Sequence, residues 1–347
     1  MLIHYYNPGY EASVSLALRG GQSFTPSKNV ALLRRDLAAL PVYWAKEDEG
    51  VLVPETLSER LRLPSFRTKL SQGEVLEPWG RAPELKQYGE VPWTLSEMDF
   101  WGNRLLSVSL FEAVLKADGG RLFPREAKVP EVVLPGSLFP VYPHVEKRIL
   151  SSSGRGVTFH PEGNPERRRN GTGEPVIAEP LYPKTRDLGF EFEVVEGGEI
   201  RYLGLSLFDT ETGRYTGNAL HHPEKETIEA RYEEYISLLK RVLGQTDLRG
   251  YVGPLGVDTL LYSSDEGERT APLVEVNIRR TMGHLSLELE KRYPEASRFE
   301  IRYGDFGELV TREPLYLRPR STEPLRPGVY PLTPVLPDTR FVAVIEV

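Results

Sequence analysis

Short apolar runs bounded by glycine and proline recur along the whole chain, whereas helical spacing of apolar residues is confined to a few stretches. The 31 Gly and 29 Pro among 347 residues suit a loop-rich protein and lie below the share typical of low-complexity sequence. No motif repeats at a fixed period, which argues against solenoids and propellers. The pattern predicts an α+β or α/β protein, and the length predicts two to three domains.

Charged residues of both signs are interspersed, with 43 Lys and Arg against 50 Asp and Glu and a formal net charge of −7. This balance argues against a surface that binds nucleic acid. The absence of cysteine excludes disulfides, thiolate metal sites and cysteine nucleophiles. No apolar run reaches the roughly 18 residues of a membrane span, and the start lacks a signal-like pattern, so we expect a cytoplasmic protein.

The first part of the chain has the pattern of a strand, a turn, a helix and a second strand. An apolar run at 2–6 precedes a Pro-Gly turn, amphipathic residues follow at 30–40, and a short apolar run occupies 51–53. This order predicts a small α/β sheet. Residues 54–100 have weak periodicity and are assigned only as connecting structure.

Two later stretches, 105–117 and 223–243, have helical spacing and end near glycine. Alternation predicts an antiparallel pair at 190–194 and 202–208, joined by a turn at 196–198. Further strands are expected at 132–134, 145–150, 176–181, 253–262, 273–278 and 341–347. The polar stretch 160–174 predicts a mobile loop, in which Asn170 forms a turn and the arginines at 167–169 form a solvated face or close over an acidic ligand.

A lysine on a predicted strand directly precedes a run of serine and glycine. In the sequence 147–157, Lys147 stands before Ser151 to Gly156, and small residues let successive backbone N–H groups converge on phosphate oxygens. The order differs from a Walker sequence, in which the lysine follows the loop. A plain flexible turn is the alternative interpretation.

Polar residues alternate strictly with apolar ones at 273–279. On a strand, Glu275, Asn277 and Arg279 share one face, because side chains point to opposite sides in turn. Carboxylate and amide oxygens suit a hard divalent cation, and Asp258 on the preceding predicted strand adds a carboxylate if the two strands pair. The alternative is a half-buried strand whose polar face is in water.

The order of these parts over about residues 104–285 resembles the ATP-grasp superfamily of ATP-dependent carboxylate ligases. The lysine strand and its Ser/Gly loop are similar to the family's phosphate-covering loop, and Val176 to Tyr182 is similar to the strand that holds the adenine edge. The resemblance implies ATP and Mg²⁺ as cofactors. It also implies the residues of the site. The residues implied for the nucleotide are Lys147, Ser153, Gly154, Arg155, Gly156, Glu179, Pro180, Leu181, Tyr182 and Asp187, with Glu191 as the alternative to Asp187. Magnesium would be held by Asp258, Glu275 and Asn277, and the catalytic residues would be Lys147 and Arg279, with Arg279 favoured over Arg280.

The same resemblance implies an ATP-grasp fold, with an N-terminal α/β domain over 1–103 and two α+β lobes, 104–182 and 183–347, enclosing a nucleotide cleft. Residues 7–11 would then face the site of the acceptor substrate. The implied function is an ATP-dependent ligase that activates a carboxylate as an acyl phosphate and joins it to an amine or another nucleophile. The alternatives are a nucleotide-binding regulatory module and a small-molecule kinase.

The expected partners are therefore small-molecule carboxylates and amines, with a homodimer left open. The six histidines show no HExxH or similar spacing, which argues against a zinc hydrolase, and the pair 221–222 is interpreted as the entry to a helix. Serines 151–153 lack the GxSxG context of a serine hydrolase.

Overall fold

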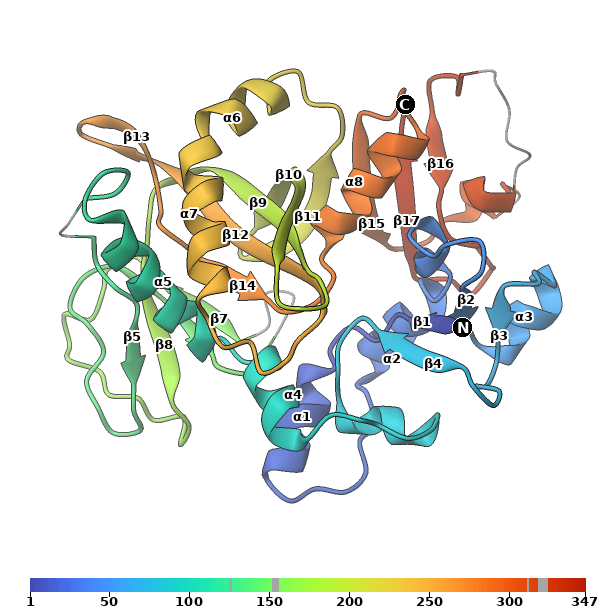
Figure 1. The fold of residues 1–347 in the computed structure, drawn as a ribbon, viewed down its shortest axis with the longest axis horizontal. Coiled ribbons are helices and arrows are strands. Elements are labelled where there is room, and N and C mark those ends of the chain that lie inside the picture. Colours follow the sequence, from blue (N-terminus) through green and yellow to red (C-terminus); the bar gives the residue numbers. More distant parts are fainter. Residues whose placement is uncertain (125–126, 152–155, 311, 318–323) are drawn as a thin grey trace. The chain divides into compact units, whose positions relative to one another are not determined.

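The computed structural model describes residues 1–124, 127–151, 156–310, 312–317 and 324–347 (Figure 1). The chain forms two compact units, each built from separate stretches of sequence. Unit 1 comprises Met1–Met98, Thr216–His222 and His284–Val347, and unit 2 comprises Asp99–Tyr215 and Pro223–Gly283. The predicted division at 103 and 182 stays a prediction.

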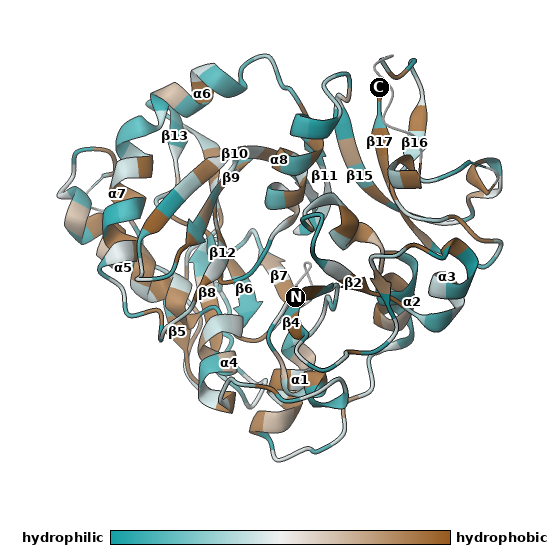
Figure 2. Cartoon of the chain, turned by 45° about the vertical axis from the view of Figure 1, so that its right-hand side comes forward, coloured by the Kyte–Doolittle hydropathy of each residue, from teal (hydrophilic) through white to brown (hydrophobic). Residues whose placement is uncertain are grey.

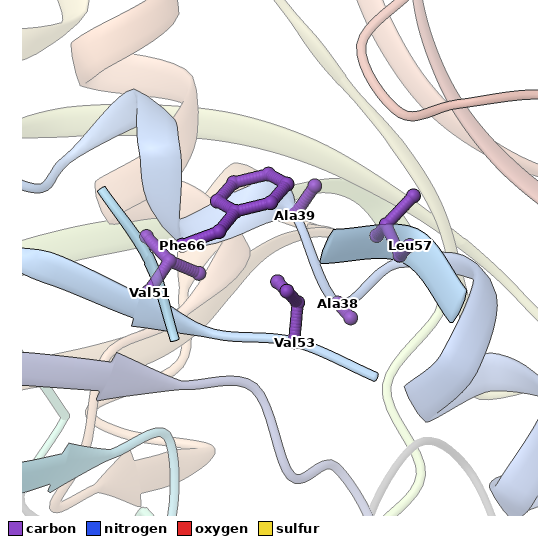
Figure 3. Close-up of a cluster of buried hydrophobic side chains, with 6 residues drawn as sticks. All are labelled: Ala38, Ala39, Val51, Val53, Leu57 and Phe66. Carbon is purple, nitrogen blue, oxygen red and sulfur yellow. The ribbon is translucent and has the colours of Figure 1, made fainter. Parts of the chain in front are cut away.

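Unit 1 contains a parallel sheet of order β3-β2-β1-β4, as the N-terminal pattern predicted. Its strands are β1 (Leu2–Tyr5), β2 (Gly50–Leu52), β3 (Phe66–Arg67) and β4 (Val75–Pro78). Its helices are α1 (Glu11–Leu18), α2 (Lys28–Asp36) and α3 (Glu55–Leu61), with 3-10 turns η1 (Leu40–Tyr43) and η2 (Pro83–Gln87). Figure 3 shows side chains that pack beside this sheet: Ala38, Ala39, Val51, Val53, Leu57 and Phe66.

The later stretches of unit 1 form antiparallel structure. Strands β15 (Arg298–Tyr303), β16 (Val329–Pro331) and β17 (Phe341–Glu346) pair in the order β15-β17-β16, and β11 (Arg214–Ala219) pairs with β15. The chain enters this part through α8 (Met282–Arg292), and η3 (Gly307–Leu309) and η4 (Leu315–Leu317) lie between β15 and β16. The predicted strand at 341–347 is confirmed as β17.

Unit 2 contains a four-stranded antiparallel sheet of order β5-β8-β6-β7. Its strands are β5 (Glu131–Val133), β6 (His144–Arg148), β7 (Val157–His160) and β8 (Val176–Pro180), which confirms three predicted strands and adds β7. The stretch 160–174 holds no regular element beyond the last residue of β7. The Asn164 and Asn170 side chains bond backbone carbonyls across it, and Arg168 pairs with Glu146.

The larger sheet of unit 2 has the order β13-β12-β9-β10, with β14 paired to β12. The bounds are β9 (Lys184–Val194), β10 (Ile200–Glu211), β12 (Gly253–Ser264), β13 (Gly267–Thr270) and β14 (Glu275–Asn277). Helix α4 (Leu95–Gly102) leads into unit 2, and α5 (Leu105–Asp118) ends at Gly119, whose φ of 66° suits glycine.

The single helix predicted at 223–243 is wrong, because two helices occupy this stretch. They are α6 (Lys225–Arg231) and α7 (Glu233–Gly244), and Tyr232 between them has φ −99° and ψ 11°. The Tyr232 ring packs against Phe190 and its hydroxyl bonds Thr270 Oγ1, so tertiary contacts hold the break. Figure 2 shows hydrophilic and hydrophobic residues alternating along α7, and Figure 1 shows α7 beside α5.

Candidate functional site

Three neighbouring strands of unit 2 present their polar residues on one face of the larger sheet. In the antiparallel registers, Asp258 lies opposite both Gly189 and Glu275, and Gly256 lies opposite both Glu191 and Asn277. Opposed residues point to the same side of a sheet. The shared face therefore carries Asp187, Gly189 and Glu191 of β9, Gly256 and Asp258 of β12, and Glu275 and Asn277 of β14. We call it the acidic face.

The opposite face of the same strands is apolar. Phe190, Val257 and Val276 alternate with the acidic residues, and the first two are fully buried. The Phe190 ring packs edge to face against Tyr235 of α7 at 5.1 Å. Burying this face fixes the register, because a slip of one residue would turn the carboxylates into the core.

Asp258 and Asn277 are in direct contact on the acidic face. The Asn277 amide Nδ2 donates to Asp258 Oδ2 over 2.9 Å. Burial raises the pKa of Asp258 well above its usual range, and the neighbouring Glu275 and Glu191 raise it further, while Arg279 opposes them. The two strands do pair, which places Asp258 beside Glu275 and Asn277 and concentrates negative charge on this face.

The negative charge of Glu275 is balanced by Arg104, a residue that the sequence analysis did not single out. Arg104 Nε lies 3.2 Å from Glu275 Oε1, and Ser107 Oγ accepts the N–H of Val276. Burial raises the pKa of Glu275, but Arg104, Lys147 and Arg279 outweigh it and lower that pKa overall. Arg104 stands just before α5 and outside any recognisable motif, so no signal in the sequence singled it out.

Arg104 also contacts the strand that carries the predicted lysine. Its Nη1 donates to the Arg148 carbonyl over 2.9 Å and to Ser151 Oγ over 2.6 Å. Its backbone N–H donates to the Ile149 carbonyl. One arginine therefore connects the end of β6 to the acidic face.

Lys147 lies on β6 and pairs with Glu179 on the adjacent β8. Their Nζ and Oε2 atoms are 2.6 Å apart, and both side chains are largely buried. Burial raises the pKa of Glu179, and Lys147 opposes that effect. Because Lys147 also lowers the pKa of Glu275, the structure brings the predicted lysine together with the predicted metal-binding strands.

The residues at the end of the predicted adenine-binding strand, 176–182, contact other parts of unit 2. The Leu181 N–H donates to the Pro143 carbonyl, and the Tyr182 ring lies 4.5 Å from that of Tyr262. The Leu181 N–H is thus engaged within the protein. Pro180 ends β8.

Asp187 lies farther along β9, at the other end of the acidic face from Glu191. Its Oδ2 accepts from Lys184 Nζ over 2.5 Å and from Thr210 Oγ1 over 2.8 Å. It is near enough to Asp258 to contribute to the raised pKa of that residue. Asp187 therefore belongs to the same electrostatic cluster as the predicted metal ligands.

The remaining predicted residues are placed as follows. Ser153, Gly154 and Arg155 lie outside the described residues. Gly156 has a φ of 67° and sits against Arg148, so a side chain there would be strained. Arg279 lies two residues beyond β14 and acts on both Asp258 and Glu275, whereas Arg280 has its carbonyl bonded by Arg279 Nη1.

The predicted acceptor segment lies in unit 1. Asn7 is fully buried, and its side chain exchanges two hydrogen bonds with the backbone of Gly80. Gly9 has a φ of 75°, and a Cβ there would meet Val30 at 3.2 Å. These contacts connect the loop after β1 to the loop after β4, and a role toward a substrate stays a prediction.

Among the described residues, no group of three or more His, Cys, Asp or Glu is arranged to hold a metal ion. Asp258, Glu275 and Asn277 nevertheless supply oxygen donors of the kind that a hard cation prefers. Burial raises the pKa of Asp258, and the nearby Glu275 and Glu191 raise it further, so a bound cation would favour its ionised form. In chemical type, the three residues fit Mg²⁺. None of the helices in the described part of the chain is long and apolar enough to cross a membrane.

No family model and no curated protein matches the sequence. Among solved structures, a variant of pyruvate carboxylase from Rhizobium etli matches 99% of this chain and 35% of its own, at 12% identity and a TM-score of 0.51. A putative ATP-grasp superfamily protein from Archaeoglobus fulgidus matches 100% of this chain and 99% of its own, at 11% identity and a TM-score of 0.49. Biotin carboxylase from Campylobacter jejuni matches 99% of this chain and 86% of its own, at 11% identity and a TM-score of 0.49.

The chain shares its fold with part of the Rhizobium etli pyruvate carboxylase. The predicted mixed α/β class is confirmed, since the described residues form helices and several sheets. At these identities the likeness concerns the fold alone, and a shared fold does not determine the reaction.

Proposed function

We propose that the chain is an ATP-dependent ligase that activates a substrate carboxylate as an acyl phosphate and joins it to an amine or another nucleophile. The observation that carries the proposal is the convergence of three cations on Glu275. Arg104, Lys147 and Arg279 each lower its pKa, beside Asp258 and Asn277. The resemblance of the sequence to the ATP-grasp superfamily supports this assignment by analogy.

Three buried or half-buried cations suit the charge of a triphosphate. Lys147 would neutralise the α and β oxygens, and Arg279 the charge that develops on the transferred phosphoryl group. Arg104 adds a fixed guanidinium beside them. Phosphoryl transfer needs positioning and charge neutralisation and little covalent participation by the protein.

Asp258, Glu275 and Asn277 would hold Mg²⁺. When bound, the ion would neutralise the β and γ oxygens of ATP. The chain's own part is to hold these oxygens on one rigid sheet face and to keep Glu275 ionised through Arg104. The crowded carboxylate of Asp258 gains most from a nearby cation, because its charge is otherwise disfavoured.

On the nucleoside side, Glu179, Pro180, Leu181 and Tyr182 would border the adenine, and Asp187 the ribose or the phosphates. Ser153, Gly154, Arg155 and Gly156 would cover the phosphates. Because the Leu181 N–H already donates to the Pro143 carbonyl, the backbone carbonyl groups of residues 179–182 would be the ones that contact the adenine. A cytoplasmic location and a homodimer stay predictions.

The proposed reaction has two steps. A carboxylate oxygen attacks the γ-phosphorus, the bond from that phosphorus to the β–γ bridging oxygen breaks, and ADP leaves. An amine nitrogen then attacks the acyl carbon, the carbon–oxygen bond to the phosphoryl group breaks, and phosphate leaves as the amine loses a proton. Neither step needs a side-chain nucleophile, which suits a chain without cysteine.

The test is phosphate release from ATP and Mg²⁺ in the presence of pooled carboxylic acids and amines. We expect release that depends on one acid and one nucleophile, and we expect Glu275→Gln to abolish it while leaving the fold intact. Accumulation of a phosphorylated acid that no amine consumes would indicate a kinase. Nucleotide binding without release from any pool would indicate a binding module.

A further inference from the structure

The buried carboxylate of Glu191 has no part in the proposed reaction steps. It lies on β9 with about 1% of its surface exposed. Its Oε1 accepts from Ser206 Oγ over 2.9 Å, and its Oε2 accepts from Thr281 Oγ1 over 2.7 Å. Ser206 belongs to β10, whereas Thr281 belongs to the segment between β14 and α8, so the carboxylate connects two separate parts of unit 2.

Three glycines make room for this carboxylate. A Cβ on Gly283 would lie 1.8 Å from Glu191 Oε1, and a Cβ on Gly189 or Gly256 would lie 2.9 Å from one of its oxygens. Any other residue at Gly283 would have to displace the carboxylate. The backbone after β14 thus approaches Glu191 as closely as glycine allows.

Thr281 ends the segment that carries Arg279. Arg279 Nη1 donates to the Arg280 carbonyl over 3.0 Å, so the side chain folds back on its own segment. From that position Arg279 acts on Asp258 and Glu275. The placement of Arg279 therefore depends on how the segment is anchored.

We infer that Glu191 is a positioning residue that, through the Thr281 hydroxyl, holds the Arg279–Thr281 segment so that Arg279 stays at the acidic face. The inference rests on the proposed function, in which Arg279 meets the transferred phosphoryl group. A buried carboxyl group that accepts one hydroxyl hydrogen bond on each oxygen is held from two sides, so it can anchor the segment that carries Thr281. Pre-organised side chains need such support to act at the right position.

The two hydroxyls offer a matched comparison. Thr281→Val removes one of them and keeps the β-branched shape, and Thr281→Ser restores it. Ser206→Ala removes the other hydroxyl from the same carboxylate and leaves the Thr281 hydroxyl in place. A carboxylate that only fills the interior would respond equally to both losses.

Hydrogen exchange of the full chain, read on the peptide that covers 276–284, tests the anchor without requiring turnover. We expect about tenfold faster exchange in Thr281→Val, the size of one lost buried hydrogen bond, with Thr281→Ser close to wild type. Ser206→Ala should leave this peptide within about twofold of wild type. Unchanged exchange in Thr281→Val, or equal acceleration in Ser206→Ala, would overturn the inference.

The kinetic readout is phosphate release from Mg-ATP with the acid and nucleophile found in the pooled screen. Thr281→Val should lower kcat by about tenfold or more and leave KM for ATP within about twofold, because a displaced Arg279 would stabilise the transition state less while ATP binding stays nearly the same. A rise in KM alone would contradict the positioning role. If wild-type protein releases no phosphate, the proposed function fails, and hydrogen exchange alone then decides the anchoring role of Glu191.

Discussion

Arg104 Nε and Glu275 Oε1 lie 3.2 Å apart, and the same guanidinium reaches the Arg148 carbonyl at the end of β6. This pair connects the strand of Lys147 to the strand of the acidic face. Removing one member of a buried ion pair costs much, and Glu275 would lose its nearest cation. Arg104→Ala should therefore destabilise unit 2 by about 3 kcal/mol.

A double-mutant cycle separates this pair from simple loss of packing. Adding Glu275→Gln to Arg104→Ala should recover part of the lost stability, since the carboxylate that lost its nearest cation is then replaced by a neutral amide. Thermal unfolding of the full chain measures both variants. Strictly additive losses would show that the two side chains do not interact.

Lys147→Ala should weaken ATP binding by about 1.5–3 kcal/mol, roughly ten- to a hundredfold, through loss of charge-assisted contacts. Isothermal calorimetry of the full chain with ATP and Mg²⁺ measures the change. Lys291→Ala is the control, because that lysine pairs on the surface of unit 1 with Glu288. Equal affinities for wild type and Lys147→Ala would remove Lys147 from the site.

Asp258→Asn should stabilise the fold at neutral pH and abolish turnover. The pKa of Asp258 is raised in the folded state, so the folded chain binds more protons than the unfolded one above pH 3.8. The associated stability is present below that pH and is lost as pH rises through the folded pKa. Asparagine does not ionise, so the variant avoids this loss of stability. Its Tm should exceed that of wild type at pH 7.5 and converge with it in acid.

Protonation of the buried His144 is expected to destabilise the fold in acid. His144 is fully buried, stacks 4.7 Å from His160, and faces Glu146 and Arg168 as well. Burial lowers the pKa of His144 below its usual 6.5, so the unfolded chain binds more protons beneath that value. The contribution is fully present above pH 6.5 and is lost as pH falls through the folded pKa.

Thermal unfolding at pH 7.5 and 5.5 measures this effect. His144→Phe should show a smaller decrease in Tm between the two pH values than wild type, because phenylalanine has no proton to gain. His221→Gln, which changes an exposed ring in unit 1, should keep the wild-type decrease. An identical decrease in His144→Phe and wild type would show that His144 is not the group concerned.

The acidic face could be predicted because its signal is local. Strict alternation around Glu275 and Asn277 fixes their common face, and the pairing with Asp258 needs only two adjacent strands. Lys147 was predicted for a similar reason, since it stands on a short strand before a Ser/Gly run. These features depend on neighbours in the sequence.

Arg104 and Glu191 could not be predicted in these roles, because their partners are far away in the chain. Arg104 meets a residue more than 150 positions later, and Glu191 meets Thr281, 90 positions later. The break at Tyr232 has the same origin, since no glycine or proline marks it and the contacts with Phe190 and Thr270 decide it. Tertiary contact, which single-sequence patterns do not contain, determines all three.

The activation of a carboxylate by phosphoryl transfer is tested most directly by the fate of its oxygen atoms. The substrate acid, labelled with oxygen-18 in its carboxyl group, is turned over with ATP, Mg²⁺ and the acceptor, and the released phosphate is analysed by mass spectrometry. We expect one labelled oxygen in each phosphate, because the carbon–oxygen bond breaks when the nucleophile displaces the phosphate. Ligated product accompanied by unlabelled phosphate would contradict it.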